Sequence, residues 1–230
     1  MPEIRTAFHQ ELEDMERTLL GVADQAEQMV QKAVEAFTTG RLDLADEVIV
    51  ADESIDETYI EIHNRWMQLM ARQQPLASDL RLMSMLLHVN TTLERMGDQT
   101  VNIAKLTRAT DGLPRVDAIV ERIQEMGDLV RAMIRTGIEA VVRRDADEAR
   151  LLPAMDEPVD RLNRDMYQEV VKVGNDPRQL EWATKAMMVA RALERVGDQV
   201  VDIGEQLVFL LTGERVEFNE VGLGGLPQRE

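Results

Sequence analysis

The chain has 230 residues, of which 44% are hydrophobic, 30% are charged and only 3% are aromatic. This composition indicates a globular, helix-rich protein, because sheets favour aromatic and β-branched residues. The formal net charge of −17 argues against nucleic acid and anionic membranes as partners, and it favours cations or basic protein surfaces. The lack of cysteine excludes disulfides, thiol catalysis and thiolate metal ligands.

The sequence shows no pattern of a signal peptide or a transmembrane helix. Its N-terminal residues alternate charged with apolar side chains, and no run approaches the roughly 18 apolar residues that a membrane span requires. We therefore expect a cytoplasmic protein with no direct membrane insertion and no nucleic-acid partner.

The first predicted helix extends to Thr39 and carries a heptad seam. Apolar residues recur there at alternating steps of four and three, as in helices that pack in bundles. Gly40 follows and suits a C-terminal cap, because glycine adopts the left-handed conformation without strain. The seam consists of Phe8, Leu12, Met15, Leu19, Val22, Ala26, Met29 and Ala33.

Two further helices complete the first half of the chain. The second is predicted over residues 43–73 and ends before Pro75, since proline disfavours helical backbone in the residue that precedes it. The third is predicted over residues 79–107, with Ser78 or Asp79 as the N-terminal cap.

The second half repeats this plan after a turn at residues 111–114, which read Asp-Gly-Leu-Pro. Helices are predicted over residues 116–143, 146–173 and 178–211 from their apolar periodicity. Residues 212–230 are rich in glycine and have no periodicity, so they are predicted to be a flexible C-terminal tail.

These six long helices predict an all-α protein made of two tandem three-helix bundles related by an internal repeat. Short loops between long helices favour antiparallel neighbours, so each half is expected to form a bundle. The first bundle is assigned to residues 1–111 and the second to residues 112–211. The helix pattern does not decide whether the bundles lie side by side or end to end.

The internal repeat is clearest in residues 93–103 and 193–203, where eight of the eleven positions are identical. Each copy places an acid at i, a second acid at i+4 and an amide or acid at i+8, all on one helix face. These residues are Glu94, Asp98 and Asn102 in the first copy and Glu194, Asp198 and Asp202 in the second.

The second helix of each half carries a further acid pair at i,i+4, Asp52 with Asp56 and Asp156 with Asp160. If the helices are antiparallel neighbours, four carboxylates converge in each half. Protons, arginines or a polyvalent cation must then offset their mutual repulsion. Ligands that are all oxygen favour Mg²⁺, Mn²⁺, Ca²⁺ or iron over a structural zinc site. The sequence therefore predicts one metal site in each half, which the residues at i+8 would extend.

Two simpler explanations of the acids stay open. Acid pairs at this spacing are common on the solvated faces of acidic helices, and Arg95 and Arg195 offer ion-pair partners. In addition, Pro153 and Pro158 fall inside the predicted fifth helix, where proline removes a backbone donor and bends the chain. The sequence therefore ranks the second site below the first.

At these residues the chain resembles the PhoU family of bacterial phosphate-transport accessory and signalling proteins. The resemblance rests on the repeated Glu-Arg-x-Gly-Asp-x-x-x-Asn/Asp stretch, on the paired acid-x-x-x-Asp motifs, and on residues 72–81 (Arg-Gln-Gln-Pro-Leu-Ala-Ser-Asp-Leu-Arg). It implies two three-helix bundles whose paired acids bind multinuclear clusters of iron or other metals. Iron, zinc, manganese and magnesium all stay open as the metal.

The resemblance also implies a function. Family members couple the ATPase subunit of a phosphate ABC transporter to a membrane sensor histidine kinase, and they repress the phosphate-starvation response when phosphate is plentiful. We expect this chain to be such a negative regulator, to act through protein contacts without enzymatic activity, and to form a homodimer. The alternative is a metal-dependent hydrolase or oxidase that uses the same carboxylates. Against it, the sequence places no nucleophile or general base beside the acids, and it lacks the Glu-x-x-His motif of di-iron oxidases.

Overall fold

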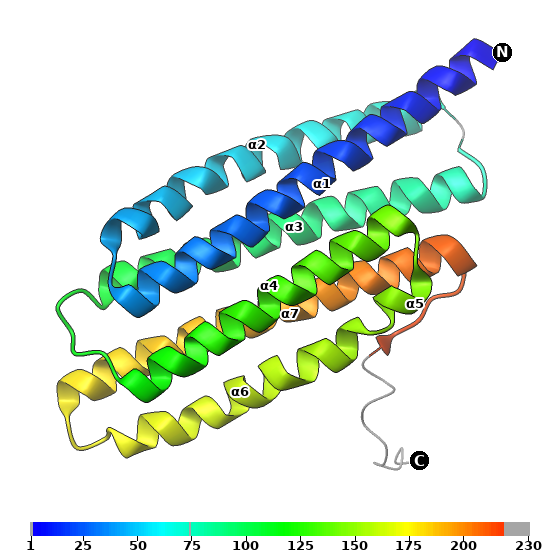
Figure 1. Cartoon of the computed structure of the whole chain (residues 1–230). Helices are drawn as coiled ribbons and strands as arrows, with labels where there is room; N and C mark the ends of the chain where they lie inside the picture. The colour runs from blue at the N-terminus through cyan, green and yellow to red at the C-terminus, as the bar shows by residue number, and fades with distance from the viewer. Residues whose placement is uncertain (1, 74, 219–230) are drawn as a thin grey trace, which may run out of the picture.

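The computed structural model describes residues 2–73 and 75–218. Within these residues every regular element is a helix, so the fold is all-α (Figure 1). The long amphipathic segments predicted from the apolar periodicity are all helical. The helices are α1 (Pro2–Thr39), α2 (Leu42–Arg72), α3 (Ser78–Ala109), α4 (Asp117–Arg143), α5 (Ala146–Ala149), α6 (Leu152–Lys172) and α7 (Pro177–Thr212).

The helices form two bundles that lie side by side (Figure 1). Helices α1, α2 and α3 pack against one another, as do α4, α6 and α7, and the short α5 packs against α4 and α7. The bundles meet where α3 packs on α7 and α1 packs on α4. One hydrophobic core therefore runs through both bundles, and it holds α3 and α7, which carry the repeated stretch, at the centre of the molecule.

The heptad seam of α1 is confirmed, because each of its eight residues is buried. Helix α1 contacts α2, α3 and α4, so its buried face is wider than a two-residue seam. Ala23 and Val30, which lie between seam positions, and Ala36, which follows the last one, are fully buried too. A helix that is enclosed on several sides needs small residues there, since neighbouring backbones approach closely.

The interface between α1 and α4 combines charge with close packing. Arg131 Nε donates to Glu27 Oε1 at 2.7 Å, and Arg135 Nη1 donates to the same oxygen at 2.9 Å. Where α1 meets α7, the Phe37 and Trp182 rings stack with their centroids 5.2 Å apart. Glu27 therefore accepts hydrogen bonds from both Arg131 and Arg135, and its side chain is only 15% exposed. This charged contact is stronger than a surface ion pair.

The prediction of one continuous helix over residues 146–173 is wrong. Helix α5 ends at Ala149, and α6 begins at Leu152 with Pro153 in its first turn. Proline is suited to this place because its missing N–H is not needed there, and its fixed φ favours the start of a new helix. Pro158 lies inside α6, which continues through it to Lys172.

Two predictions at helix ends have different outcomes. Gly40 ends α1 as predicted, with φ of 74°, and its N–H donates to the Ala36 carbonyl at 2.9 Å. The prediction that Ser78 or Asp79 caps α3 is wrong. Ala77 holds the cap position with φ of 42°, and no side chain accepts from the first turn. Ser78 is instead the first residue of the helix, so its hydroxyl cannot serve as the cap.

The predicted tail, residues 212–230, is described only as far as Phe218. Thr212 is the last residue of α7, and Gly213 follows it with φ of 77°. Phe218 is buried, and its backbone N–H donates to Glu205 Oε1 at 2.7 Å. The described part of the tail therefore packs back on α7, while residues 219–230 lie outside the described residues. None of the described helices is long and apolar enough to cross a membrane.

Candidate metal centres

The acid pairs lie on helices that pack directly against each other. Helix α2 packs on α3, and α6 packs on α7. Residues at i and i+4 share a helix face, so each pair points at the pair on its neighbour. The first cluster consists of Asp52, Asp56, Glu94 and Asp98. The second cluster consists of Asp156, Asp160, Glu194 and Asp198.

In the first cluster, Asp52 is the most enclosed acid of α2. Its Oδ1 atom is buried and has no hydrogen-bond partner within the described part of the chain. Burial, and then the charges of Asp56, Asp98 and Glu94, raise the pKa of Asp52 to about 6, and the charge of Lys105 opposes this shift least among the causes. Burial and Asp98 also raise the pKa of Glu94. No lysine or arginine side chain among the described residues offsets the charge of Asp52 and Glu94 fully, so their ionised forms are disfavoured.

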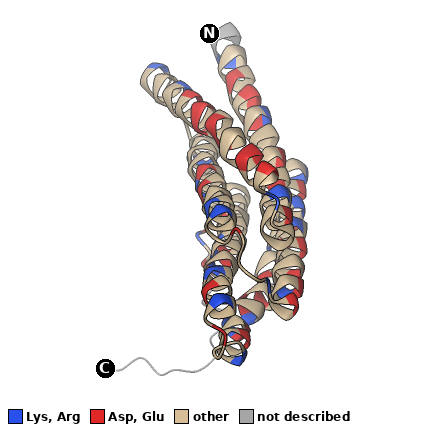
Figure 2. Cartoon of the chain, turned by 90° about the vertical axis from the view of Figure 1, so that its left-hand side faces the viewer, with Lys and Arg blue, Asp and Glu red and all other residues tan. Residues whose placement is uncertain are grey.

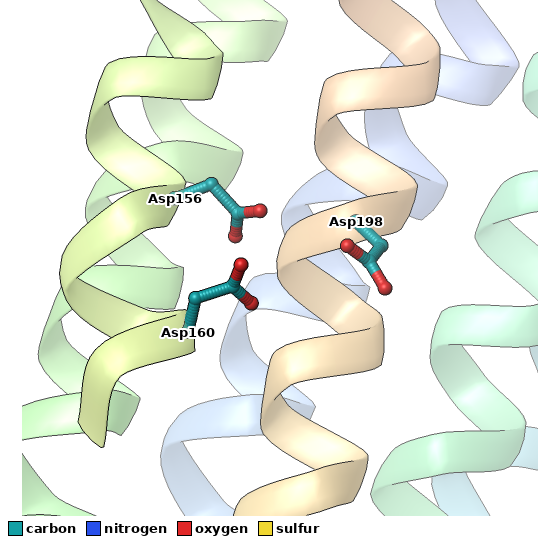
Figure 3. Close-up of side chains that lie close together, drawn as sticks. All are labelled: Asp156, Asp160 and Asp198. Atoms are coloured by element: carbon teal, nitrogen blue, oxygen red, sulfur yellow. The ribbon is translucent and has the colours of Figure 1, made fainter. Parts of the chain in front are cut away.

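In the second cluster the acids come closer together. One carboxylate oxygen each from Asp156, Asp160 and Asp198 can be chosen so that all three atoms lie within 4.8 Å of one another (Figure 3). Asp156 is only 7% exposed, and its buried Oδ1 has no hydrogen-bond partner among the described residues. Burial, followed by the charge of Asp160 and then of Asp198, raises its pKa to about 7.

The second cluster is also partly neutralised by arginines. Arg191 pairs with Glu194 Oε1, and Arg164 Nη1 lies 3.6 Å from Asp160 Oδ2. The other oxygen of Glu194, Oε2, is buried and has no hydrogen-bond partner in the described part of the chain. Burial remains the largest influence on Glu194 and Asp198, and it raises the pKa of both. The arginines therefore reduce the repulsion but leave inward-facing oxygens free to accept a ligand.

A glycine of the repeated stretch makes room for each buried aspartate. A Cβ atom at Gly97 would lie 2.4 Å from Asp52 Oδ1, and a Cβ atom at Gly197 would lie 2.4 Å from Asp156 Oδ1. Glycine inside a helix costs about 0.5–1 kcal/mol relative to alanine. Its presence at the same place in both copies is explained by this close approach of the neighbouring carboxylate.

This role of the glycines was missed at the level of the sequence, although the signal was present. Gly97 and Gly197 stand in the middle of strongly periodic helical segments. A mid-helix glycine with no capping role indicates a close approach by another group. The arginines of the second cluster gave no such signal, because an exposed arginine on a charged helix is ordinary.

The proline inside α6 does not separate the second cluster. Helix α6 runs unbroken through Pro158, so Asp156 and Asp160 keep the spacing of one helical turn. Among the described residues, the only three acids with oxygens mutually close enough to share one ion are in this cluster. The geometric ranking of the two sites is therefore the reverse of the one that the sequence favours.

The i+8 residues of the repeat, Asn102 and Asp202, are not among the three closely grouped acids of the second cluster. Asn102 lines a groove between α3 and α7 and is exposed. Asp202 is exposed as well, and its charge acts on His88 and Arg95 of α3. Both i+8 residues therefore face the neighbouring bundle. Arg95 is exposed and is directed to this interface, so it does not neutralise the first cluster by an ion pair.

The donor set fits a hard or borderline cation. Each cluster offers carboxylate oxygens from two helices, and three of the buried oxygens have no hydrogen-bond partner in the part of the chain that the structure describes (Asp52 Oδ1, Asp156 Oδ1 and Glu194 Oε2). Buried acceptors are normally satisfied, so orphaned ones call for a proton or an ion. The raised pKa values of Asp52 and Asp156 have the same origin, because burial comes first among their causes and the charges of neighbouring carboxylates come second.

Together, the fold and the clusters define an all-α, two-bundle protein with a carboxylate cluster repeated in each half. The model of the PhoU domain matches residues 19–107 and 123–207, so both halves carry that domain and the chain belongs to the PhoU family. The family is thereby established over most of the chain.

Named relatives agree with this assignment. The chain is 33% identical to the phosphate-specific transport system accessory protein PhoU homolog of Clostridium acetobutylicum, over 94% of this chain and 99% of that protein. It is 33% identical to the homolog of Pseudomonas putida, over 93% of this chain and 84% of that protein. Both relatives are named as accessory proteins of a phosphate-specific transport system, and neither name is that of an enzyme.

Solved structures show the same fold. The crystal structure of PhoU from Pseudomonas aeruginosa superposes with a TM-score of 0.84 at 31% identity, over 90% of this chain and 100% of that one. The phosphate transport system regulatory protein PhoU from Streptococcus pneumoniae gives a TM-score of 0.82 at 27% identity, over 91% of this chain and 99% of that one. The all-α two-bundle architecture is therefore the architecture of the family.

Proposed function

We propose that this protein is a negative regulator of phosphate uptake and of phosphate-starvation signalling. It acts through contacts with the ATPase subunit of a phosphate ABC transporter and with a membrane sensor histidine kinase. Its two carboxylate clusters hold metal ions, with iron, manganese, magnesium and zinc as the candidates. A cytoplasmic location follows from contact with an ATPase, and we propose a homodimer as the working assembly.

The observation that carries this proposal is the occurrence of the same acid cluster in both halves of a PhoU-family chain. In each half a buried aspartate oxygen without a hydrogen-bond partner lies against a glycine of the facing helix. A buried carboxylate without a hydrogen-bond partner lowers the stability of the fold unless it binds a cation or a proton. Its repetition in both halves supports a binding role, and the names of the relatives support the link to phosphate transport.

A bound metal would supply positive charge between the facing acid pairs. The protein's own residues do the rest. Asp156 and Asp160 present oxygens from α6, and Asp198 presents one from α7, so these three residues would hold a shared ion between the two helices. Asp52 on α2 and Glu94 on α3 also act on each other electrostatically, although their cluster is not as closely grouped. The clusters therefore stiffen the faces that α2 and α6 present to partner proteins.

The metal assignment is tested by the double variant Asp156→Asn with Asp198→Asn. We expect elemental analysis of the protein, purified without chelator, to show loss of the second cluster's metal. A matched control, Asp165→Asn with Glu181→Gln, makes the same charge change on α6 and α7 outside the cluster and should retain the metal. Full metal content in the first variant would show that the site is assigned to the wrong residues.

The partner assignment is tested in the same preparations. We expect the wild-type protein to co-purify with the transporter ATPase and the sensor kinase from phosphate-replete cells, and the double variant to recover less of both. Recovery of neither partner with the wild-type protein would refute the regulatory function, whatever the metal content. Sedimentation of the purified protein measures the proposed dimer independently.

A further inference from the structure

A groove whose lining contains none of the clustered acids runs between α3 and α7, where the two bundles meet. Its volume is about 720 Å³. Leu106 of α3 and Met187 and Met188 of α7 contribute apolar side chains to it. Met188 is 57% exposed and Met187 is 36% exposed. Exposed methionines in a groove provide an adaptable apolar surface of the kind that accepts partner helices.

The charged residues that line this groove are all basic, in a chain whose net charge is −17. They are Lys105 of α3 and Arg191 and Arg195 of α7. Arg191 is paired with Glu194. Within the described part of the chain, neither Lys105 nor Arg195 has a carboxylate within the 4.0 Å of an ion pair. Lys105 acts on Asp52, and Arg195 acts on Glu194 and Asp198, through space without a direct ion pair. Their N–H groups are therefore available to an acidic ligand.

The shape of the groove fits a helix. It extends from Gln99 to Ala109 on α3 and from Thr184 to Arg195 on α7, which is about three helical turns, or about 16 Å, on each side. Its two walls are helices that lie against each other, so a third helix can pack along their shared seam. A segment of about 11 residues would follow the full length of the groove.

The internal repeat provides a comparison within the same molecule. A shift of 100 residues places Asp202 where Asn102 stands and Glu205 where Lys105 stands, while Arg95 takes the place of Arg195. The equivalent surface at the other end of α3 and α7 is therefore acidic in balance. The protein's own chain also lies there, since the N–H of Phe218 donates to Glu205. The basic, open character belongs to one groove and is not a consequence of the repeat.

We propose that the groove between α3 and α7 binds an amphipathic helix of a partner protein, with carboxylates flanking its apolar stripe. The apolar stripe packs on Leu106, Met187 and Met188, and the carboxylates pair with Lys105 and Arg195. Figure 2 shows acidic and basic residues interspersed along the helices, so a groove with cations alone is distinctive on this chain. A free inorganic anion fits less well, because it would pair with the cations alone and leave Leu106, Met187 and Met188 uncovered.

This inference rests on the proposed function in one respect, namely that the protein acts by binding partner proteins. It is tested with a fluorescent, lactam-bridged helical peptide of 14 residues that carries leucine at i, i+3 and i+7 and glutamate at the flanking positions. Binding is followed by fluorescence anisotropy with the full-length protein. A second peptide has lysine in place of every glutamate. We expect saturable binding of the acidic peptide alone, and weaker binding as salt is added.

Three variants locate the binding surface. Met188→Glu should weaken the acidic peptide about tenfold, because it places a carboxylate in the apolar contact. Tyr167→Glu on α6 is the matched control, since Tyr167 is 59% exposed and Met188 57%, and it should bind like the wild type. Lys105→Gln should weaken binding about threefold and flatten its salt dependence. Unchanged metal content and melting temperature confirm that each variant is folded.

Several outcomes would overturn the proposal. They are no saturable binding up to millimolar peptide, equal binding of the lysine peptide, equal loss in the Met188→Glu and Tyr167→Glu proteins, and complete displacement of the peptide by equimolar inorganic phosphate. The peptide assay uses no transporter or kinase. Failure of the groove and failure of the regulatory function are therefore distinguishable, because either can occur while the other test succeeds.

Discussion

Replacing Gly197 by alanine separates the role of this position in stability from its role in the second cluster. The added Cβ would lie 2.4 Å from Asp156 Oδ1, a distance at which the two atoms cannot coexist. The atom that must move is the end of a flexible carboxylate, so the Asp156 side chain rotates and the backbone stays in place. The substitution therefore displaces the oxygen that has no hydrogen-bond partner.

Two opposing effects set the stability of this variant. Alanine favours a helix interior by about 0.5–1 kcal/mol over glycine. A carboxylate forced out of its preferred rotamer costs about 0.5–1.5 kcal/mol. We therefore expect Gly197→Ala to change the free energy of unfolding by less than about 1 kcal/mol. Metal affinity should fall about ten- to hundredfold, because an oxygen is displaced from the site.

Urea denaturation measures the stability change, and calorimetric titration with Mn²⁺ into chelator-treated protein measures the affinity. The control is Gly127→Ala, where the added Cβ would lie 2.8 Å from a branched methyl group of buried Val34. That variant should lose about 1–3 kcal/mol of stability and keep its Mn²⁺ affinity. Unchanged Mn²⁺ affinity in Gly197→Ala would refute the reasoning that this glycine positions the Asp156 carboxylate.

Two more predictions concern charge. The pKa of Asp156, raised from 3.8 to about 7, means that the folded state binds an extra proton between these values. Metal-free protein therefore loses stability relative to Asp156→Asn as pH rises from about 4 to about 7, by up to about 4 kcal/mol. Urea denaturation across this range with chelator checks it, and a pH-independent difference would contradict it. Separately, Glu27→Gln should cost about 1–3 kcal/mol in urea denaturation, because it leaves Arg131 and Arg135 without their shared carboxylate. A loss no greater than that of Asp128→Asn, an exposed acid beside Arg131, would contradict it.

The sequence predicted the helices well because their signal is local. The seam of α1 repeats over four turns or more, and each of its residues is buried as predicted. The failures fall where one residue decides the outcome. Pro153 starts a new helix after α5 instead of bending a continuous one, and Ala77 takes the cap position that Ser78 or Asp79 was predicted to hold. Periodicity carries no information about such single positions.

The sequence predicted which acids form each cluster, but it did not predict how their oxygens are arranged. The i,i+4 spacing placed each acid pair on one face, and the repeat matched the pairs between the two halves. Which oxygens are buried depends on how α2 meets α3 and how α6 meets α7. The closer grouping of Asp156, Asp160 and Asp198, and the aspartate seated on Gly197, both follow from that packing.

The long helical segments, the duplication and the family were predictable from residue order, because periodic burial and repeated motifs are properties of the sequence. Only the tertiary structure placed the bundles side by side, turned Asn102 and Asp202 toward the facing bundle, and opened a basic groove between α3 and α7. These features depend on contacts between residues about 100 positions apart. No local pattern encodes such contacts, since they arise from how whole helix faces fit together.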